Sequence, residues 1–235
     1  MELLHSYNNR FIDFTVLNLN VNSKQLKNAA RVALTYECTG FCIQANAVSV
    51  VKKVLEGSKT KLVVVPNWVL GGGLNPNNEW KLSCCKEADE VDYVIDVYNT
   101  YELKDWNKVA NDIHKVKKYS KILKVILELN YLRMTHFNER TKLMHQAVDI
   151  SIANGADWVK TDSGLYSRQD HKNTVGGISL TETAFEGLLD DTISLIKYSK
   201  VPVKCAGGIR TKEQTNKLID IGVKRIGTSS FEVIK

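Results

Sequence analysis

Two lysines of this 235-residue sequence lie inside runs of apolar residues that are typical of buried strands. Lys160 stands in the run Asp-Trp-Val-Lys-Thr, and Lys204 in the run Val-Pro-Val-Lys-Cys-Ala. A buried lysine is costly unless it is paired with an acid. A third run, Glu-Val-Asp-Tyr-Val-Ile-Asp, carries Asp92 and Asp96, whose even spacing predicts that both carboxylates share one face of a strand. If the faces that carry these groups point inward, two amines and a carboxylate meet in one place.

The chemistry that uses two adjacent lysines is the formation of an imine with a carbonyl compound. The attacking amine must be neutral, whereas an unperturbed lysine has a pKa of about 10.4. A second ammonium group nearby disfavours the charged form of the first lysine. Either lysine alone is explained at least as well by a structural ion pair or by exposure to solvent. The pair together with an acid favours catalysis, with the carboxylate, or a water that it activates, as general acid and base.

Glycine and serine residues follow two later runs, at positions where parallel barrels often bind phosphate. These positions are the loops after the seventh and eighth strands. Glycines let backbone N–H groups approach a ligand closely, and hydroxyl groups can donate further hydrogen bonds. We therefore predict a phosphate site formed by Gly207, Gly208, Gly227, Ser229 and Ser230, with Gly164 nearby.

These residues need a scaffold that brings the ends of several strands together. Short β-branched runs alternate with amphipathic segments, which indicates a parallel sheet with crossover helices. The predicted strands are Phe11–Val16, Gly40–Gln44, Lys61–Val65, Val91–Val97, Leu123–Glu128, Trp158–Thr161, Val201–Ala206 and Arg225–Thr228. The predicted helices lie near Ser23–Thr35, Ala47–Leu55, Trp80–Ala88, Leu103–Lys118, Glu139–Asn154, Thr183–Tyr198 and Lys212–Ile221, with a short one after Ser229.

Eight such units in a chain of this length predict an α/β protein, a (β/α)8 TIM barrel with a single domain over residues 1–235. An open Rossmann sheet is the alternative. It is disfavoured because the sequence lacks a G-x-G-x-x-G loop after the first strand and a G-x4-G-K-[ST] loop. In a barrel the carboxyl ends of the strands form the active site, so the lysines and the glycine turns are expected at the same face.

The composition indicates which classes of partner the protein can bind. The net charge is +6, but lysines are spread along the chain, which excludes a nucleic-acid interface and leaves attraction of an anionic small ligand. No apolar run reaches the roughly 20 residues of a membrane span, and the N-terminus lacks a signal-peptide pattern. We therefore expect a cytoplasmic protein without a membrane partner. The five cysteines are expected to be reduced, and neither a metal site nor a cofactor is expected.

Several of these segments resemble, in order, the strands of the deoxyribose-phosphate aldolase family. The likeness extends from about residue 11 to residue 231. It implies a class I, metal-free aldolase that cleaves 2-deoxyribose 5-phosphate through a lysine Schiff base. The segments are Phe11-Ile-Asp-Phe-Thr-Val-Leu, Gly40-Phe-Cys-Ile-Gln-Ala-Asn, Ala88-Asp-Glu-Val-Asp-Tyr-Val-Ile, Lys124-Val-Ile-Leu-Glu, Gly155-Ala-Asp-Trp-Val-Lys-Thr-Asp-Ser-Gly, Val203-Lys-Cys-Ala-Gly-Gly-Ile-Arg-Thr and Arg225-Ile-Gly-Thr-Ser-Ser.

The resemblance implies that Lys160 is the nucleophile, Lys204 its electrostatic partner and Asp92 the acid and base. Thr161 and Cys42 join the predicted substrate-binding residues. Lys204 is followed by two more strand residues before its loop, so we expect it to lie deeper than Lys160. The expected partner is a phosphorylated sugar, and a homodimer is one candidate assembly.

The sequence also departs from the family pattern. Phe14 stands where the family usually has a histidine, and Asp162-Ser163 stands where a Ser-Thr pair is common. If Asp162 points into the site, its negative charge would favour the ammonium form of Lys160 and weaken the nucleophile. Two alternatives therefore stay open. One is another phosphosugar Schiff-base aldolase, and the other is a phosphosugar-binding barrel whose amine is disabled.

Overall fold

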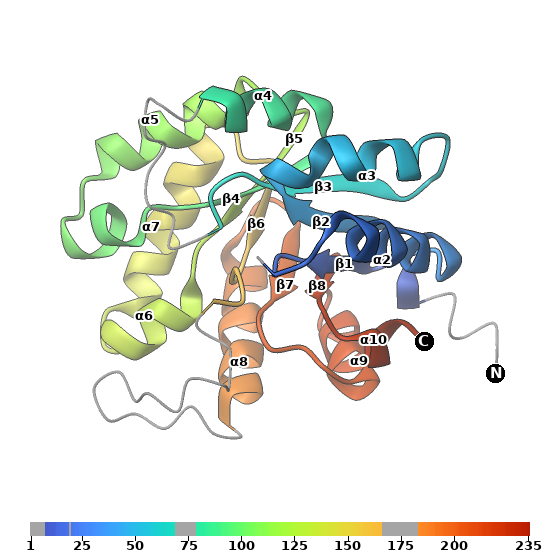
Figure 1. Ribbon diagram of the computed structural model, residues 1–235. Coiled ribbons are helices and arrows are strands. Elements are labelled where there is room, and N and C mark those ends of the chain that lie inside the picture. Colours follow the sequence, from blue (N-terminus) through green and yellow to red (C-terminus); the bar gives the residue numbers. More distant parts are fainter. Residues whose placement is uncertain (1–7, 19, 69–78, 166–182) are drawn as a thin grey trace.

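Eight parallel strands close into a barrel in the computed structural model of the protein, which describes residues 8–18, 20–68, 79–165 and 183–235 (Figure 1). Each strand pairs with the next, and β1 pairs with β8 to close the ring. The predicted TIM barrel is therefore confirmed, and the open sheet is excluded. The strands are β1 (Ile12–Val16), β2 (Gly40–Gln44), β3 (Lys61–Val65), β4 (Glu90–Val94), β5 (Ile122–Ile126), β6 (Trp158–Lys160), β7 (Val203–Ala206) and β8 (Arg225–Thr228).

Helices connect the strands and surround the barrel (Figure 1). Within the described ranges, no helix has the length and apolar character needed to cross a bilayer. The helical segments are α2 (Ser23–Thr35), η1 (Ala45–Ala47), α3 (Val48–Leu55), α4 (Glu79–Glu87), the π-helical η3 (Tyr98–Glu102), α5 (Trp106–Lys117), α6 (Leu129–Thr135), α7 (Arg140–Ala153), α8 (Thr183–Tyr198), α9 (Lys212–Asp220) and α10 (Phe231–Ile234).

Local sequence signals explain where two of these helices begin. The Asn22 side chain accepts a hydrogen bond from the backbone N–H of Gln25, and the Gln25 side chain accepts one from the backbone N–H of Asn22, both at 3.0 Å. Thr211 and Gln214 form the same reciprocal pair at the start of α9. Each capping box satisfies two backbone donors that the first turn of a helix leaves open.

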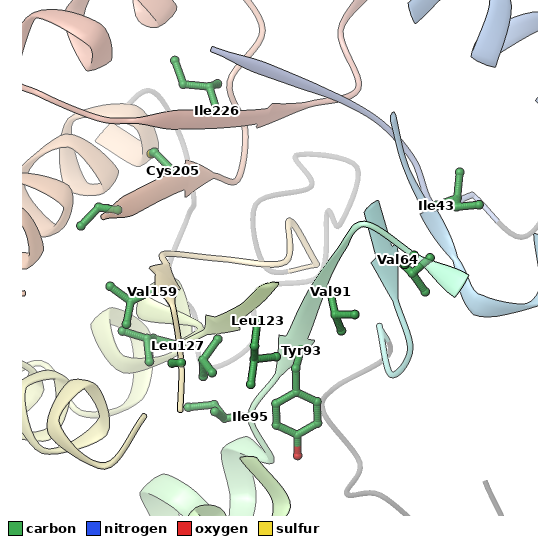
Figure 2. Packing of buried hydrophobic residues seen from close by; sticks show 14 of the residues in the cluster. Ile43, Val64, Val91, Tyr93, Ile95, Leu123, Leu127, Val159, Cys205 and Ile226 are labelled. Atoms are coloured by element: carbon green, nitrogen blue, oxygen red, sulfur yellow. The ribbon is translucent and has the colours of Figure 1, made fainter. Parts of the chain in front are cut away.

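Strand residues that point outward pack under the helices and form the main hydrophobic core. Figure 2 shows Val91 and Tyr93 of β4 near Leu123 of β5 and Val159 of β6 in this core. Because side chains alternate along a strand, the residues between these positions point into the barrel. Asp92 is one of them, so the sequence pattern that builds the outer core also places charged groups inside.

Strand β4 is shorter than predicted, since it ends at Val94 and not at Val97. Asp96 accepts hydrogen bonds from the backbone N–H (3.1 Å) and the side-chain amide (2.8 Å) of Asn99, which starts η3 in place of further strand. Local side-chain bonds of this kind compete with a sheet ladder. The prediction that Asp92 and Asp96 share a strand face is therefore wrong, because Asp96 lies beyond the strand.

A second difference lies after β5, where the sequence prediction has no helix and the structure has α6. Glu128, which precedes α6, adopts a left-handed backbone conformation with φ 52° and ψ 56°. This conformation is uncommon for a residue with a side chain and costs about 1–2 kcal/mol. It turns the chain sharply from the end of β5 into α6, and propensity alone gives no signal for such a turn.

Candidate active site

Asp92 lies at the centre of a buried ionic cluster inside the barrel. Its Oδ2 accepts hydrogen bonds from Nζ of Lys160 (2.8 Å) and from Nζ of Lys204 (2.7 Å). Its Oδ1 accepts a third from Nζ of Lys124 (3.1 Å). Lys160 and Lys204 are register partners on β6 and β7. The fold thus brings together the two lysines and the acid that the sequence singles out.

A second set of charged side chains extends this cluster. Lys204 also forms an ion pair with Asp13, and Lys124 forms one with Glu90. Arg225 joins the two acids, because its Nη1 lies 2.7 Å from Oδ1 of Asp13 and 3.3 Å from Oε2 of Glu90. The ion pairs therefore form a continuous network through the interior of the barrel.

The network carries an excess of positive charge if every group is ionised. Its cations are Lys124, Lys160, Lys204 and Arg225, and its anions are Asp13, Glu90 and Asp92. Among the described residues, Lys160 pairs with one carboxylate, whereas each other cation pairs with two. Lys160 is therefore the cation with the fewest carboxylate partners in the network.

Burial and ion pairing act in opposite directions on the central groups. Burial raises the pKa of Asp92, but the ammonium groups of Lys124, Lys160 and Lys204 outweigh it and hold that pKa well below its usual range. Burial lowers the pKa of Lys204, but the carboxylates of Asp13 and Asp92 outweigh it and raise that pKa. Both shifts favour the charged forms, so Asp92 is an anion and Lys204 a cation at neutral pH.

A cleft of about 510 Å³ opens above this network. Its volume falls within the range of small-molecule sites, and its wall combines an amine, a guanidinium and hydroxyl groups with backbone turns. Lys204 and Asp92 are not part of the wall, and both are fully buried. The predicted residues in the wall are Lys160, Gly164, Gly207, Gly208, Gly227 and Ser229. The wall also contains the polar residues Thr15, Asn18, Ser163, Arg210 and Thr228.

Three predicted binding residues lie outside the wall. The Thr161 hydroxyl donates to the carbonyl oxygen of Ala206 (2.8 Å) and accepts from its N–H (3.0 Å). The Ser230 hydroxyl donates to the carbonyl oxygen of Arg210 (2.9 Å). Cys42 belongs to a small apolar cluster inside the barrel, where burial raises the pKa of its thiol to about 11. Thr161 and Ser230 therefore brace the turns around the cleft, and Cys42 is a neutral packing residue.

Asp162 is directed toward the start of α6. Its Oδ1 accepts a hydrogen bond from the backbone N–H of Asn130 (2.8 Å), and only 1% of the residue is exposed. Burial, and after it the charge of Glu128, raises the pKa of Asp162 well above its usual range. These effects favour the protonated form of Asp162. The structure therefore removes the expected reason for Asp162 to weaken Lys160.

The other members of the network have no role predicted from the sequence, although a signal for two of them is present. Asp13 and Lys124 interrupt apolar strands in the same way as Lys160 does. Glu90 and Arg225 stand at strand starts, where a charged residue is common at the surface. Their placement in the interior follows from the closure of the barrel. Arg210 follows the Gly207-Gly208 turn, and its contribution to the wall of the cleft depends on the loop geometry.

Comparison with known proteins adds an independent line of evidence. Residues 10–229 match the model of the DeoC/LacD family of aldolases. The chain is 32% identical over 226 residues to the deoxyribose-phosphate aldolase of Finegoldia magna, covering 94% of this chain and 95% of that protein. It is 31% identical over 229 residues to the deoxyribose-phosphate aldolase of Mycoplasmopsis pulmonis, covering 94% of this chain and 92% of that protein.

The fold also resembles that of a solved structure. The deoxyribose phosphate aldolase of Aeropyrum pernix, described as a unique tetramer, superposes with a TM-score of 0.75 at 24% identity. The match covers 98% of this chain and 90% of that one. The strand order and the barrel closure are therefore those of a known fold.

Proposed function

The chain belongs to the DeoC/LacD family of aldolases, and from this premise we propose that it cleaves 2-deoxy-D-ribose 5-phosphate to D-glyceraldehyde 3-phosphate and acetaldehyde. The reaction is that of a class I aldolase, in which a lysine amine forms a Schiff base with the substrate. One observation carries the proposal: the lysine that lines the cleft is also the network cation with a single carboxylate partner among the described residues, and that partner is Asp92.

Lys160 is the proposed nucleophile. Its neutral amine attacks C1 of the open-chain aldehyde, and loss of water gives an imine. The protonated imine withdraws electrons from the C2–C3 bond. Asp92, which lies 2.8 Å from the Lys160 amine, then acts directly or through a water to take the proton of the C3 hydroxyl. The C2–C3 bond breaks, and glyceraldehyde 3-phosphate leaves. Protonation and hydrolysis of the remaining enamine release acetaldehyde and restore the amine.

Lys204 has a proposed electrostatic role. Its two carboxylate partners keep it charged, so it cannot compete with Lys160 as a nucleophile. Its ammonium group lies on the same Asp92 oxygen as the Lys160 amine and disfavours a second positive charge there. It thereby supports the neutral form of the nucleophile before the imine forms.

The phosphate of the substrate is proposed to bind at the glycine turns of the cleft. Gly207 and Gly208 follow β7, Gly227 lies in β8, and Ser229 follows β8, all at the carboxyl end of the barrel. Arg210 adds a positive charge to the same wall, and positive charge favours an anionic group there. Contacts remote from the reacting bond help to orient C1 toward Lys160.

Two alternatives make different predictions. A phosphosugar-binding barrel without catalysis requires a disabled amine, but the feature that suggested it, an ionised Asp162, is disfavoured by burial. Another phosphosugar Schiff-base aldolase would use the same lysine with another sugar. A panel of phosphorylated sugars separates that case, because cleavage of 2-deoxyribose 5-phosphate should be the fastest.

The nucleophile is identified by trapping the imine. Borohydride reduction in the presence of acetaldehyde should leave an ethyl group on Lys160, located by peptide mapping, and Lys160→Ala should carry none. An ethyl group on Lys204 with Lys160 unmodified would overturn the assignment. An unlabelled wild-type protein would instead identify a binding protein without catalysis.

We further propose that residues 1–235 form one domain, that the protein works in the cytoplasm and that it binds neither nucleic acid nor a membrane. The assembly stays a prediction. The homodimer expected from the sequence is distinguished from a monomer or a tetramer by light scattering coupled to size-exclusion chromatography.

A further inference from the structure

Two buried carboxyl groups lie where the end of β5 meets the turn after β6. The Glu128 Oε2 atom accepts a hydrogen bond from the backbone N–H of Ser163 (3.3 Å), which belongs to the turn after β6. In return, the Asp162 Oδ1 atom accepts one from the backbone N–H of Asn130 (2.8 Å), which follows β5. Each acid therefore holds the segment that carries the other. A backbone hydrogen bond from Leu129 to the carbonyl oxygen of Thr161 (3.1 Å) lies between these two contacts.

One oxygen of each acid has no hydrogen-bond partner among the described residues. These atoms are Oε1 of Glu128 and Oδ2 of Asp162, and each residue is 1% exposed. A buried polar atom without a partner costs about 1–3 kcal/mol. The charge of Glu128 also acts on Asp162, so two ionised carboxylates at this place would repel each other. A single proton on the pair removes one of the two buried negative charges.

The charges around the two acids do not neutralise them. Lys160 is the cation whose charge acts on Glu128, and its described carboxylate partner is Asp92. Asp191 of α8 acts on Asp162 with a like charge, although Arg133 and Arg140 pair with it. The charges of both acids act on Tyr101, and that of Asp162 acts on Cys205; burial raises the pKa of both groups. Each described cation near the two acids therefore forms its ion pair with another carboxylate.

We propose that Glu128 and Asp162 share a proton and act as a positioning pair that holds the turn after β6, and with it Ser163 and Gly164, in the cleft. The turn directly follows Lys160, and both of these residues line the cleft. The pair thus fixes one wall of the substrate site relative to the nucleophile. Its function in catalysis rests on the aldolase activity proposed above, but the shared proton does not.

The pair responds to pH in a defined direction. Burial raises the pKa of Glu128 to about 7, and burial together with the charge of Glu128 raises the pKa of Asp162 well above its usual range. Both acids are therefore neutral in acid solution, and one proton remains on the pair above about pH 7. Loss of the last proton at higher pH leaves two buried like charges, which repel and release the turn.

The shared proton is tested first without reference to activity. At pH 7.5 the pair should hold roughly one proton. The infrared spectrum of the protein at this pH should therefore contain a C=O band of a buried protonated carboxyl group. The band should be absent from the Glu128→Gln/Asp162→Asn double variant. Asp149→Asn, which changes an exposed acid of α7, is the matched control and should keep the band.

The positioning role is tested by the pH profile of KM for 2-deoxyribose 5-phosphate. In the wild type, KM should rise at alkaline pH with a smaller change in kcat. Asp162→Asn should flatten this rise, because the pair then carries at most one negative charge at every pH. Asp162→Ala should raise KM roughly tenfold across the whole range, as expected for the loss of one buried hydrogen-bonded group.

The outcomes separate the two proposals. A spectrum in which the wild type lacks the band, or in which the double variant keeps it, overturns the shared proton. An Asp162→Asn profile that rises as in the wild type overturns the positioning role. A protein that shows the band but cleaves no substrate retains the proton-sharing pair and loses the proposed function.

Discussion

Lys160 and Lys204 have the same side chain and the same register position on neighbouring strands, so their different roles must come from their partners. Lys204 is paired with Asp13 and Asp92, whereas Lys160 is paired with Asp92 alone among the described residues. Each close carboxylate favours the ammonium form. A second difference is access, because Lys160 borders the cleft and Lys204 does not.

Replacing the permanent cation should impair the nucleophile. In Lys204→Leu, Asp13 and Asp92 lose a shared counter-charge, and the negative charge left over favours the ammonium form of Lys160. Trapping of acetaldehyde by borohydride should therefore be slower by about tenfold or more at neutral pH, and should recover partly as pH rises, because free amine becomes more abundant. The rate of adduct formation across pH measures this directly.

Lys160→Ala is the control for the trapping experiment with Lys204→Leu. That variant should form no adduct at any pH, since the nucleophile itself is missing. A Lys204→Leu protein that is equally inactive at all pH values would contradict a purely electrostatic role for Lys204.

The sequence predicts residues such as Lys160, Lys204 and Asp92 because each interrupts an apolar strand. The same signal is present at Asp13 and Lys124, so most of the ionic network is accessible from the sequence. The Glu128–Asp162 pair is not. It depends on two reciprocal backbone contacts and on a left-handed residue, and no local pattern encodes how two loops meet.

At the scale of elements, the turns after β7 and β8 hold each other in place. The Thr228 hydroxyl donates to the carbonyl oxygen of Ile209 (2.7 Å), and the Ser230 hydroxyl donates to that of Arg210 (2.9 Å). The last residue of β8 and a residue just after it thereby fix the loop after β7. The glycine-lined wall of the cleft is therefore a rigid unit, as phosphate binding by backbone groups requires.

Gly207 is a position in this unit that accepts a side chain only with strain. Its φ is +110°, and a Cβ there would lie 3.0 Å from Cβ of Asp162. Gly207→Ala should therefore displace the turn and raise KM for the phosphorylated substrate by about tenfold, for a strain of about 1–2 kcal/mol. Steady-state kinetics should show a smaller effect on kcat, because Lys160 and Asp92 lie on other strands.

Gly222→Ala is the matched control. Gly222 also has a left-handed backbone, with φ +101°, but a Cβ there would meet nothing within 4 Å, and it lies in the connection between α9 and β8. It should lower the melting temperature through the same backbone strain and leave KM unchanged. Equal effects of the two variants on KM would show that backbone strain, and not the shape of the cleft, controls phosphate binding.

The bounds predicted from the sequence agree with the structure better for several strands than for the segments that connect them. β2, β3 and β8 have the predicted bounds, because apolar β-branched runs end at recognisable turn residues. The start of α5 differs, since Asp105 accepts a hydrogen bond from the backbone N–H of Lys108 (3.0 Å) and caps the helix at Trp106, not at Leu103. Such caps are local, but several candidates compete in a polar loop and tertiary packing selects one.

At the scale of the whole molecule, closure of the barrel produces the active site. Pairing of β1 with β8 brings Asp13 next to Arg225, which are 212 residues apart in the chain. The network therefore links strands β1, β4, β5, β6, β7 and β8 across the interior. A change of charge at one end of the network should alter the protonation of groups at the other end, because the interior contains little water and screens charge weakly.

Arg225 and Glu90 provide the test, since neither contacts Lys160 in the structure. Arg225→Met leaves three carboxylates for two permanent cations, so it should favour the ammonium form of Lys160 and slow acetaldehyde trapping. It should also lower the free energy of unfolding by about 3–5 kcal/mol, as for other broken buried ion pairs. Adding Glu90→Gln restores the balance of charge. The double variant should therefore trap acetaldehyde faster than the sum of the two single-variant effects predicts. Its free energy of unfolding should likewise be higher than that sum predicts.

Lys52 and Glu87 form the control pair on the surface, where their atoms are 3.2 Å apart and their side chains are 54% and 50% exposed. The Lys52→Met/Glu87→Gln cycle should show a coupling below about 1 kcal/mol in urea unfolding and no change in trapping rate. If the Arg225–Glu90 cycle behaves in the same way, the interior charges act as independent pairs. If instead the trapping rate follows the balance of charge, the reactivity of Lys160 is a property of the closed barrel and not of its immediate neighbours alone.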